Sequence, residues 1–488
     1  MTIDVTIEFN KMSEIKQKTE NPENPNIEEN NLNFESTEES TEPFFSGARG
    51  AAVKILSRFE RSDAYLDKLL DFEYRTGNLS QLDKSLLTEI LYGVIRWKSK
   101  LDFILNGFYN GDYMKCLNLV KNTLRVGLYQ ILFLDRIPVA AAINESVELV
   151  KKIQGDRIAG IVNAVLRNIA RNIDNIRFPE KEDDPIYYLT VMQSHPRWLV
   201  RRWVQRFGPN EAEELMEVNN QRPYTTIRVN TQKATVDEII AYCFEEDIEF
   251  KNDPYNANSL VIMNNKIKIP SLEIFNEGKI TIQDSSASLA AQLTAAKPGD
   301  KVIDLCASPG GKSFYIAEMM KDEGSIIALD KYEVKINIIN QSIERLGYKS
   351  ITAHQSDAMD YQSDELFDVV LCDMPCSGLG TLSKKPDIKW KREREDIYKL
   401  AETQRNILKN AALLVKEGGT LVYSTCTIEP EENTDNIKWF LENFEDFELD
   451  DASKYLPHSV CKDGMMQTFQ HFHNIDGAFA ARLIKKSK

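Results

Sequence analysis

Residues 301–312 read KVIDLCASPGGK. The first half of this stretch, KVIDLC, is short and apolar, which predicts a buried strand. Gly310 and Gly311 then separate the strand from a helical segment, Ser313–Lys321. Glycines at that point let a ligand approach the backbone amides at the N-terminus of the helix. The stretch therefore predicts the first strand, turn and helix of an α/β domain, with a ligand at the turn.

Two common nucleotide-binding motifs do not fit this turn. A phosphate-binding P-loop needs GxxxxGK[ST]. Gly311-Lys312-Ser313 matches the end of that motif, but its first glycine would fall on Cys306. The dinucleotide fingerprint GxGxxG is also absent from the turn. What remains is an adenosine-type ligand without a dominant phosphate contact, such as S-adenosylmethionine, and a purely structural turn is the alternative.

Further apolar strands follow the first one at short intervals. SIIALD (325–330), FDVVLCD (367–373) and GTLVYSTC (419–426) alternate with helical segments at 334–346 and 396–415. Such alternation predicts a parallel sheet covered by helices, with ligands bound at the carboxyl ends of the strands.

Carboxylates stand at successive strand ends. Asp330 closes SIIALD, Asp357 lies just beyond ITAHQS, and Asp373 closes FDVVLCD. A single aspartate at such a place is most often a cap or turn residue. Three aspartates at successive strand ends instead favour a shared ligand-binding crevice. Asp330 also has the spacing from Gly311 that suits a contact with ribose hydroxyls.

Two cysteines follow strand ends of the same sheet. Cys376 lies three residues beyond Asp373, and Cys426 follows the strand GTLVY. A lone cysteine is more often an inert buried residue, which is the interpretation for Cys306 and Cys372. The pair Cys376 and Cys426, with a carboxylate nearby, predicts covalent catalysis.

The seven cysteines show neither a disulfide framework nor a paired CxxC set, so we expect a reducing cytoplasmic setting and no metal. No stretch approaches about 18 consecutive apolar residues, and we expect no membrane span. The N-terminus has no basic or apolar region of the secretory type.

The rest of the chain divides by composition. Residues 1–45 are rich in Asn, Glu, Ser and Thr, and we expect disorder there. Helical apolar stripes run from 47 to 178, for example at 51–59, 117–133 and 158–169, and predict an all-α domain. Short strands around a helix at 236–245 predict a small α/β subdomain at about 222–275.

Charge is unevenly distributed along the chain. The net charge is −15, but residues 46–179 carry a net +6, which is compatible with phosphate contact. Arg197–Arg206 and Lys384–Arg394 are two further basic segments. We expect these three regions to be candidate RNA-binding surfaces, although each alone fits an ordinary solvated face.

In combination, CASPGGK, DMPCSG and STCT resemble the motifs of the RNA cytosine-5 methyltransferases. The helical half is similar to the NusB-type RNA-binding domain, and a chain with both parts resembles the bacterial RsmB/Sun family, which methylates 16S ribosomal RNA. The stretches that carry the upstream resemblance are LRVGLYQ (124–130), Pro138 with Asn144-Glu145, VNAVLR (162–167), SHPRWLVRRW (194–203), RVN (228–230) and Gln283-Asp284.

The resemblance implies an acidic tail at 1–45, a NusB-like helical domain at 46–180, linker helices with a small α/β subdomain at 181–278, and a Rossmann-like methyltransferase domain at 279–488. It implies methylation at C5 of a cytosine in 16S ribosomal RNA through a covalent adduct at C6. The expected partner is that RNA, the cofactor S-adenosylmethionine, and the protein a monomer without metal or membrane.

The resemblance also implies roles for particular residues. Cys426 is expected to be the nucleophile and Cys376 to aid product release, while Asp373 contacts the N3/N4 edge of the cytosine. DNA cytosine methyltransferases instead use the PC cysteine, which would be Cys376. The expected cofactor-binding residues are Cys306, Ala307, Ser308, Pro309, Gly310, Gly311, Lys312, Asp330, Asp357 and Asp373.

The chain departs from the family pattern at three positions. The family usually has Ala where Ser308 and Met374 stand, and DGFF where this chain has Asp476-Gly477-Ala478-Phe479. Two other functions stay open at this point. One is a cytosine-5 methyltransferase of tRNA or another RNA. The other is a catalytically silent RNA-binding or antitermination-like factor, against which both cysteine motifs argue.

Overall fold

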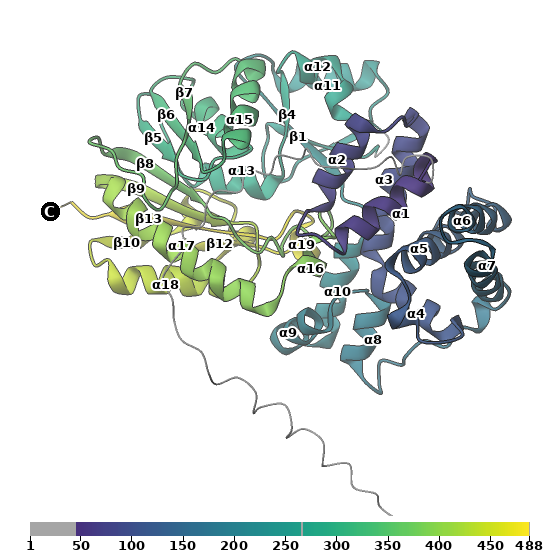
Figure 1. Ribbon diagram of the computed structural model, residues 1–488. Coiled ribbons are helices and arrows are strands. Elements are labelled where there is room, and N and C mark those ends of the chain that lie inside the picture. The colour runs from purple at the N-terminus through teal and green to yellow at the C-terminus, as the bar shows by residue number, and fades with distance from the viewer. Residues whose placement is uncertain (1–44, 265–266, 488) are drawn as a thin grey trace, which may run out of the picture. The chain divides into compact units, whose positions relative to one another are not determined.

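The computed structural model describes residues 45–264 and 267–487, so the tail expected at 1–45 lies outside the described residues apart from Phe45. Figure 1 shows the helical part that follows. Its helices are α1 (Gly47–Phe59), α2 (Leu66–Thr76), α3 (Gln81–Arg96), α4 (Lys98–Phe108), α5 (Asn118–Phe133), α6 (Val139–Gln154) and α7 (Asp156–Arg171). The first strand of the described chain begins at Thr225, so the prediction of an all-α domain is confirmed.

Helix α5 lies at the centre of this domain and packs against α1, α3, α4, α6 and α7. Ten of its residues are buried, and four of these are polar or charged, namely Asn122, Thr123, Arg125 and Gln130. A close approach with α3 depends on Gly93, because a Cβ atom there would lie 1.9 Å from the ring of Tyr129. Helices α2 and α4 carry only narrow apolar faces and were not predicted.

Three helices and a small sheet connect the two larger parts. The helices are α8 (Pro185–Met192), α9 (Arg197–Phe207) and α10 (Pro209–Asn220). The sheet is antiparallel, with the order β2-β3-β1-β4, and contains β1 (Thr225–Val229), β2 (Phe250–Asn252), β3 (Ser259–Ile262) and β4 (Ile280–Ile282). Its helices are α11 (Val236–Glu245) and α12 (Glu273–Asn276). Strand β4 pairs with β1 although it lies beyond the boundary expected at 278.

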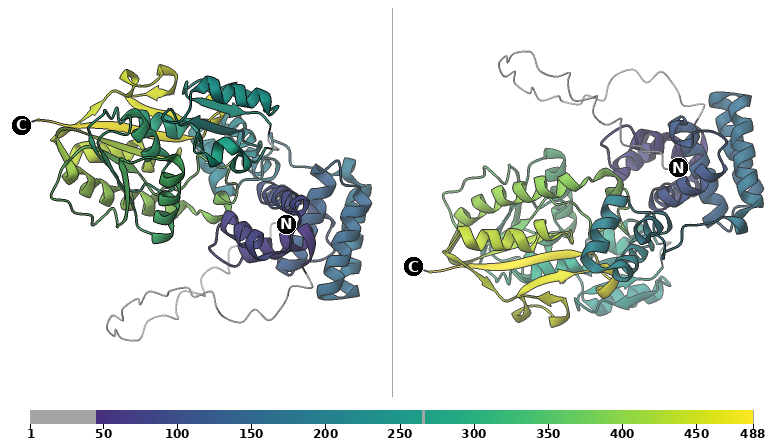
Figure 2. Two further views of the ribbon diagram at one scale, coloured as in Figure 1. Left: turned by 90° about the horizontal axis from the view of Figure 1, so that it is seen from above. Right: turned by 90° about the horizontal axis from the view of Figure 1, so that it is seen from below.

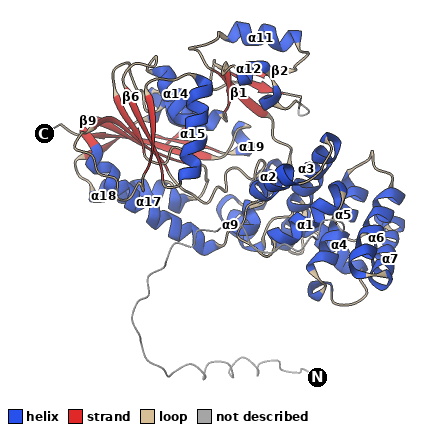
Figure 3. Cartoon of the chain, turned by 45° about the horizontal axis from the view of Figure 1, so that its top comes forward, coloured by secondary structure: helices blue, strands red, loops and turns tan. Residues whose placement is uncertain are grey.

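The C-terminal part is built on a large mixed sheet, drawn in red in Figure 3. Its order is β11-β12-β13-β9-β8-β5-β6-β7, with β10 beside β13. The strands are β5 (Lys301–Asp304), β6 (Ser325–Asp330), β7 (Ile351–Gln355), β8 (Phe367–Asp373), β9 (Val415–Thr425), β10 (Phe447–Asp450), β11 (Cys461–Lys462), β12 (Met465–Thr468) and β13 (Ala478–Lys485).

The predicted parallel pairing is confirmed for the run from β9 to β7, and the antiparallel strands β10 to β13 beside it were not predicted. Strand β13 pairs antiparallel with β9, and β12 and β10 pair antiparallel with β13. The physical reason is that β13 follows β12 through a short connection, which permits antiparallel pairing but not a parallel crossover.

Helices cover both faces of this sheet, as Figures 1 and 2 show. They are α13 (Ser285–Gln292), α14 (Gly311–Met319), α15 (Glu333–Leu346), α17 (Arg394–Leu414) and α18 (Thr434–Asn443), with short helices α16 (Ile388–Lys391) and α19 (Gln470–His473) in the loops. Val302 of β5 joins the core with α14 and α15, while its neighbour Ile303 joins the core with α17 and α18. Burial on both faces explains the continuous apolar runs.

Candidate active site at the ends of β8 and β9

The register of two neighbouring strands brings the cysteines together. Asp373, the last residue of β8, is paired with Ser424 of β9, so the loops that carry Cys376 and Cys426 leave the sheet at the same level. The two Sγ atoms lie 3.1 Å apart. The backbone N–H of Cys426 donates to Cys376 Sγ at 3.3 Å. The Cys426 side chain is exposed and Cys376 is half-buried, so Cys426 is the more accessible thiol.

The pKa values of the two thiols are shifted in opposite directions. The hydrogen bond from the Cys376 thiol lowers the pKa of Cys426, and the positive charges of Lys312 and Lys385 act in the same sense against burial and Asp373. The same hydrogen bond, together with burial, raises the pKa of Cys376 well above its usual value. These directions make Cys426, rather than Cys376, the thiol of the pair that ionises more easily.

Asp373 joins this pair to the glycine-rich turn. Its carboxylate accepts a hydrogen bond from Lys312 Nζ at 2.7 Å and another from Ser424 Oγ at 2.9 Å. Lys312 stands in the first turn of α14, directly after Gly310 and Gly311. The sequence-predicted residues at the ends of β5, β8 and β9 therefore meet at one edge of the sheet.

The turn itself is tightly folded. Gly310 has φ +105°, and a Cβ atom there would lie 2.3 Å from the ring of Phe314. The Ser308–Pro309 peptide bond is cis. Below the turn, buried Asp304 accepts a hydrogen bond from Ser313 Oγ at 2.6 Å, and burial raises the pKa of Asp304 to about 7. The left-handed backbone at Gly310 favours glycine. Because glycine has no side chain, a ligand can approach the backbone of the turn closely.

Acidic groups surround Cys306 in this turn. Burial raises the pKa of Cys306, and the charges of Asp304, Asp373 and Asp330 add to that effect. Asp330 is buried and contacts Lys335 Nζ at 3.1 Å and the N–H of Tyr332. A ligand with a sulfonium and an ammonium group fits this acidic edge, since carboxylates stabilise a nearby cation.

Asp357 follows β7, at the far end of the parallel run. It accepts a hydrogen bond from the N–H of Met359 at 3.0 Å and forms an ion pair with Lys331 at 2.9 Å. These contacts lower its pKa, with the Met359 N–H first among the causes. The carboxylate is thus charged and partly exposed on the same edge as Asp330.

Sequence reasoning missed a buried network behind the cysteine loops. Glu432 accepts hydrogen bonds from the N–H of Ser377 at 2.8 Å and from Gln404 Nε2 at 3.0 Å, and burial raises the pKa of Glu432 to about 7. Gln404 also donates to the carbonyl of Pro375 at 2.9 Å. The segment EPEE (429–432) reads as a solvated loop, so its sequence carried no signal of burial.

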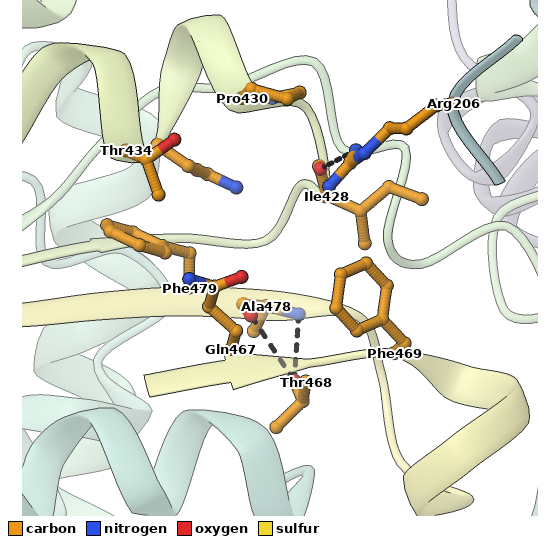
Figure 4. Close-up of a pocket in the computed structure, with 10 residues that line it drawn as sticks. Arg206, Ile428, Pro430, Thr434, Gln467, Thr468, Phe469, Ala478 and Phe479 are labelled. Atoms are coloured by element: carbon orange, nitrogen blue, oxygen red, sulfur yellow. Dashed lines mark hydrogen bonds between the residues drawn. The ribbon is translucent and has the colours of Figure 1, made fainter. Parts of the chain in front are cut away.

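Helix α9, which carries one of the basic segments expected as candidate RNA-binding surfaces, contacts the loop after Cys426. Arg202 forms ion pairs with Glu429 and Glu431, and Arg206 donates to the carbonyl of Ile428 at 2.5 Å. Figure 4 shows Arg206 and Ile428 beside a cavity of about 40 Å³ that Phe469 and Ala478 also line. This volume holds water but no nucleobase.

Most of the second expected surface, Lys384–Arg394, is also engaged within the protein. Lys389 is buried and donates to the carbonyl of Arg96 at 3.1 Å, and Lys391 donates to the carbonyl of Phe59 at 2.6 Å. Arg392 donates to the carbonyls of Ser377 and Cys376 at 3.2 and 3.3 Å. These cations bind backbone carbonyls within the protein, while Lys385 and Arg394 of the same segment are exposed.

Neither a metal cluster nor a membrane span occurs in the described chain. Among residues 45–264 and 267–487, no cluster of three or more His, Cys, Asp or Glu side chains has an arrangement that could hold a metal ion. In the same ranges, no helix has the length and apolar character needed to cross a membrane.

Comparison with known proteins follows the same three-part division. Residues 46–171 match the NusB family, residues 195–269 match the ferredoxin-like domain of RsmF/B-like methyltransferases, and residues 291–484 match the family described as 16S rRNA methyltransferase RsmB/F. The crystal structure of PH0851 superposes with a TM-score of 0.74 at 27% identity and covers 90% of this chain and 98% of that one. A methyltransferase homologue from Pyrococcus horikoshii gives a TM-score of 0.56 at 27% identity, covering 62% and 99%.

The fold and the cysteine-bearing site thus define a methyltransferase domain joined to a NusB-type helical domain. The "Probable ribosomal RNA small subunit methyltransferase B" of Bacillus subtilis is 37% identical over 90% of this chain and 99% of its own length. Ribosomal RNA small subunit methyltransferase B of Escherichia coli is 35% identical over 84% and 92%. The chain belongs to the ribosomal RNA small subunit methyltransferase B family.

Proposed function

We propose that the chain transfers a methyl group from S-adenosylmethionine to C5 of a cytosine in 16S ribosomal RNA, through a covalent bond between Cys426 and C6. The observation that carries the proposal is the contact of 3.1 Å between the sulfur atoms of Cys376 and Cys426. C5 of cytosine is a weak nucleophile, and a thiolate that adds at C6 makes C5 enamine-like. The site therefore needs an ionised thiol with a second group beside it.

Cys426 suits the role of nucleophile because it is exposed and its pKa is lowered by the Cys376 thiol. Its sulfur forms the bond to C6, and the electron pair of the C5–C6 double bond moves to C5, which forms the bond to the methyl carbon. When bound, S-adenosylmethionine would supply that methyl group as an electrophile, and its methyl–sulfur bond would break with the electron pair left on the departing sulfur, which becomes a neutral thioether. Loss of the proton from C5 then restores the double bond and expels the Cys426 thiolate.

Cys376 suits the release step. Its pKa is raised chiefly because it donates to Cys426. Once Cys426 is bonded to C6 as a neutral thioether, that cause disappears, and Cys376 ionises more easily. An ionised Cys376 beside the adduct is a base for the C5 proton.

The cofactor is assigned to the turn from Cys306 to Lys312. Asp330 would bind the ribose hydroxyls, Asp357 would approach the adenine amino group, and Asp373 would border both the cofactor and the cytosine. The acidic edge around Cys306 supports this assignment because the cofactor is cationic. The names of the relatives supply the substrate class, 16S ribosomal RNA.

Mass spectrometry of nucleosides from 16S ribosomal RNA tests the function. A deletion strain should lose one 5-methylcytidine, which the wild-type gene restores and the Cys426→Ala gene does not. An unchanged 16S level, or a loss confined to tRNA, would contradict the proposed substrate.

A further inference from the structure

A second, larger cavity lies between the small sheet and the methyltransferase domain. Its volume is about 490 Å³, which is within the range of sites that bind small organic groups. One wall comes from the segments around β1, β2 and β3, and the other from the start of α13, the loop at 383–384 and residues 470–476. None of the expected cofactor-binding residues lines it.

The walls of this cavity are fixed by contacts across it. Tyr255 Oη donates to the carbonyl of His473 at 3.2 Å, which joins the small sheet to α19. Lys384 Nζ contacts Asp476 at 2.8 Å and also pairs with Asp284. Lys384 thus holds both carboxylates, Asp284 and Asp476, at the floor of the cavity.

The floor of the cavity is directly connected to the cysteine loops. The N–H of Gly477, next to Asp476, donates to the carbonyl of Gly380 at 2.8 Å, and the N–H of Gly380 donates to the carbonyl of Cys426 at 3.1 Å. The charge of Lys385 acts on both the Cys426 thiol and the Asp476 carboxyl. Two backbone hydrogen bonds thus link the floor of the cavity to the loop that carries Cys426.

Two aromatic side chains that line the cavity are unusually exposed. Tyr224 is 49% exposed and Phe472 is 57% exposed. Lys251, an exposed cation, and the amide side chains of Asn252 and Asn474 line the same space. Flat aromatic faces, amide groups and a cation are the set that proteins use to bind unstacked bases and their phosphates.

We propose that this cavity binds a nucleotide of the substrate RNA that flanks the target cytosine, with Tyr224 and Phe472 as stacking surfaces and Lys251 near its phosphate. The inference rests on the proposed function. A base that enters the active site must leave its stack, which deprives its neighbour of a stacking partner. The exposed rings replace that partner and hold the RNA while Cys426 reacts.

Methyl-transfer kinetics of the full-length protein on a 16S ribosomal RNA transcript test the proposal. Tyr224→Leu and Phe472→Leu keep apolar bulk but remove the aromatic faces. Each should raise the KM for RNA roughly tenfold, the scale of one lost base stack, and leave the KM for S-adenosylmethionine unchanged. Phe244→Leu is the matched control, because Phe244 is 74% exposed on α11 of the same subdomain but does not line the cavity.

Ultraviolet crosslinking of the wild-type protein to the same transcript gives a readout that does not depend on turnover. Mass spectrometry should find nucleotide adducts on Tyr224 or Phe472 and none on Phe244. An unchanged KM for RNA in both variants, or a raised KM for S-adenosylmethionine alone, would overturn the proposal. A wild-type protein that does not methylate the transcript would instead count against the proposed function.

Discussion

The indole Nε1 of Trp203 donates a hydrogen bond of 2.9 Å to the Glu429 carboxylate, although 226 positions separate the two residues in the chain. Both side chains are fully buried, and Glu429 lies three residues beyond Cys426. Arg202 of the same helix supplies the opposite charge. Helix α9 thus fixes the loop that carries the proposed nucleophile.

Trp203→Phe should destabilise the protein by about 1–3 kcal/mol, because it leaves a buried carboxylate oxygen without its donor. Urea unfolding measures the change. The control is Trp198→Phe on the same helix, since the Trp198 indole makes no hydrogen bond within the described ranges. Equal stability of the two variants would show that the Glu429 contact contributes nothing.

Asp330→Ala should weaken S-adenosylmethionine binding by about 1–3 kcal/mol, the scale of a lost hydrogen bond to a charged group. Isothermal titration calorimetry of the apoprotein gives the affinity directly. Asp364→Ala is the control, because Asp364 is an exposed carboxylate of the same domain. An unchanged affinity in Asp330→Ala would remove the assignment to the ribose.

Asp304 makes stability depend on pH. Burial raises its folded-state pKa to about 7, above the ordinary value of 3.8, so its stabilising contribution is complete below about pH 4 and is lost as the pH rises through 7. Asp304→Asn removes this titration. The unfolding free energy of the variant minus that of wild type should therefore be roughly 1–3 kcal/mol larger at pH 8 than at pH 5. Thermal melts measure the effect. If Asp304→Asn changes the Tm by the same amount at pH 5 and at pH 8, the raised pKa of Asp304 is refuted.

RNA binding by the helical domain should depend on cations that the structure leaves exposed on α6 and α7, namely Lys152, Arg157 and Arg171. Changing all three to Gln should weaken binding of the full-length protein to 16S ribosomal RNA. The plot of log association constant against log salt concentration should also become less steep, by about 0.7–0.9 for each phosphate that the variant no longer neutralises. Lys399→Gln, an exposed cation on α17, serves as the control. The same slope in the triple variant and wild type would exclude this face.

Much of the fold could be predicted because its signals are local. The apolar strands around Asp330, Asp373 and Cys426 are buried on both faces, and the glycines after Cys306 mark the turn between strand and helix. The strand pair β12–β13 was missed, since three of the eight residues in AFAARLIK are alanine, which strands disfavour.

The candidate site was predicted only in part. Register between β8 and β9 places Cys376 beside Cys426, as the shared position at strand ends predicted. Which cations of the basic segments are buried could not be predicted, because burial depends on partners far away in the chain, such as Glu429 for Arg202 and the Arg96 carbonyl for Lys389. Charge alone does not show whether a lysine meets solvent or a carbonyl.

Trapping of the covalent intermediate tests the central claim most directly. Cys376→Ala and Cys426→Ala proteins are incubated with 16S ribosomal RNA and S-adenosylmethionine and resolved by denaturing electrophoresis, with thermal melts to confirm folding. If Cys426 attacks C6 and Cys376 aids release, Cys376→Ala accumulates a protein–RNA adduct and Cys426→Ala forms none. An adduct with Cys426→Ala and none with Cys376→Ala would reverse the two roles and contradict the account.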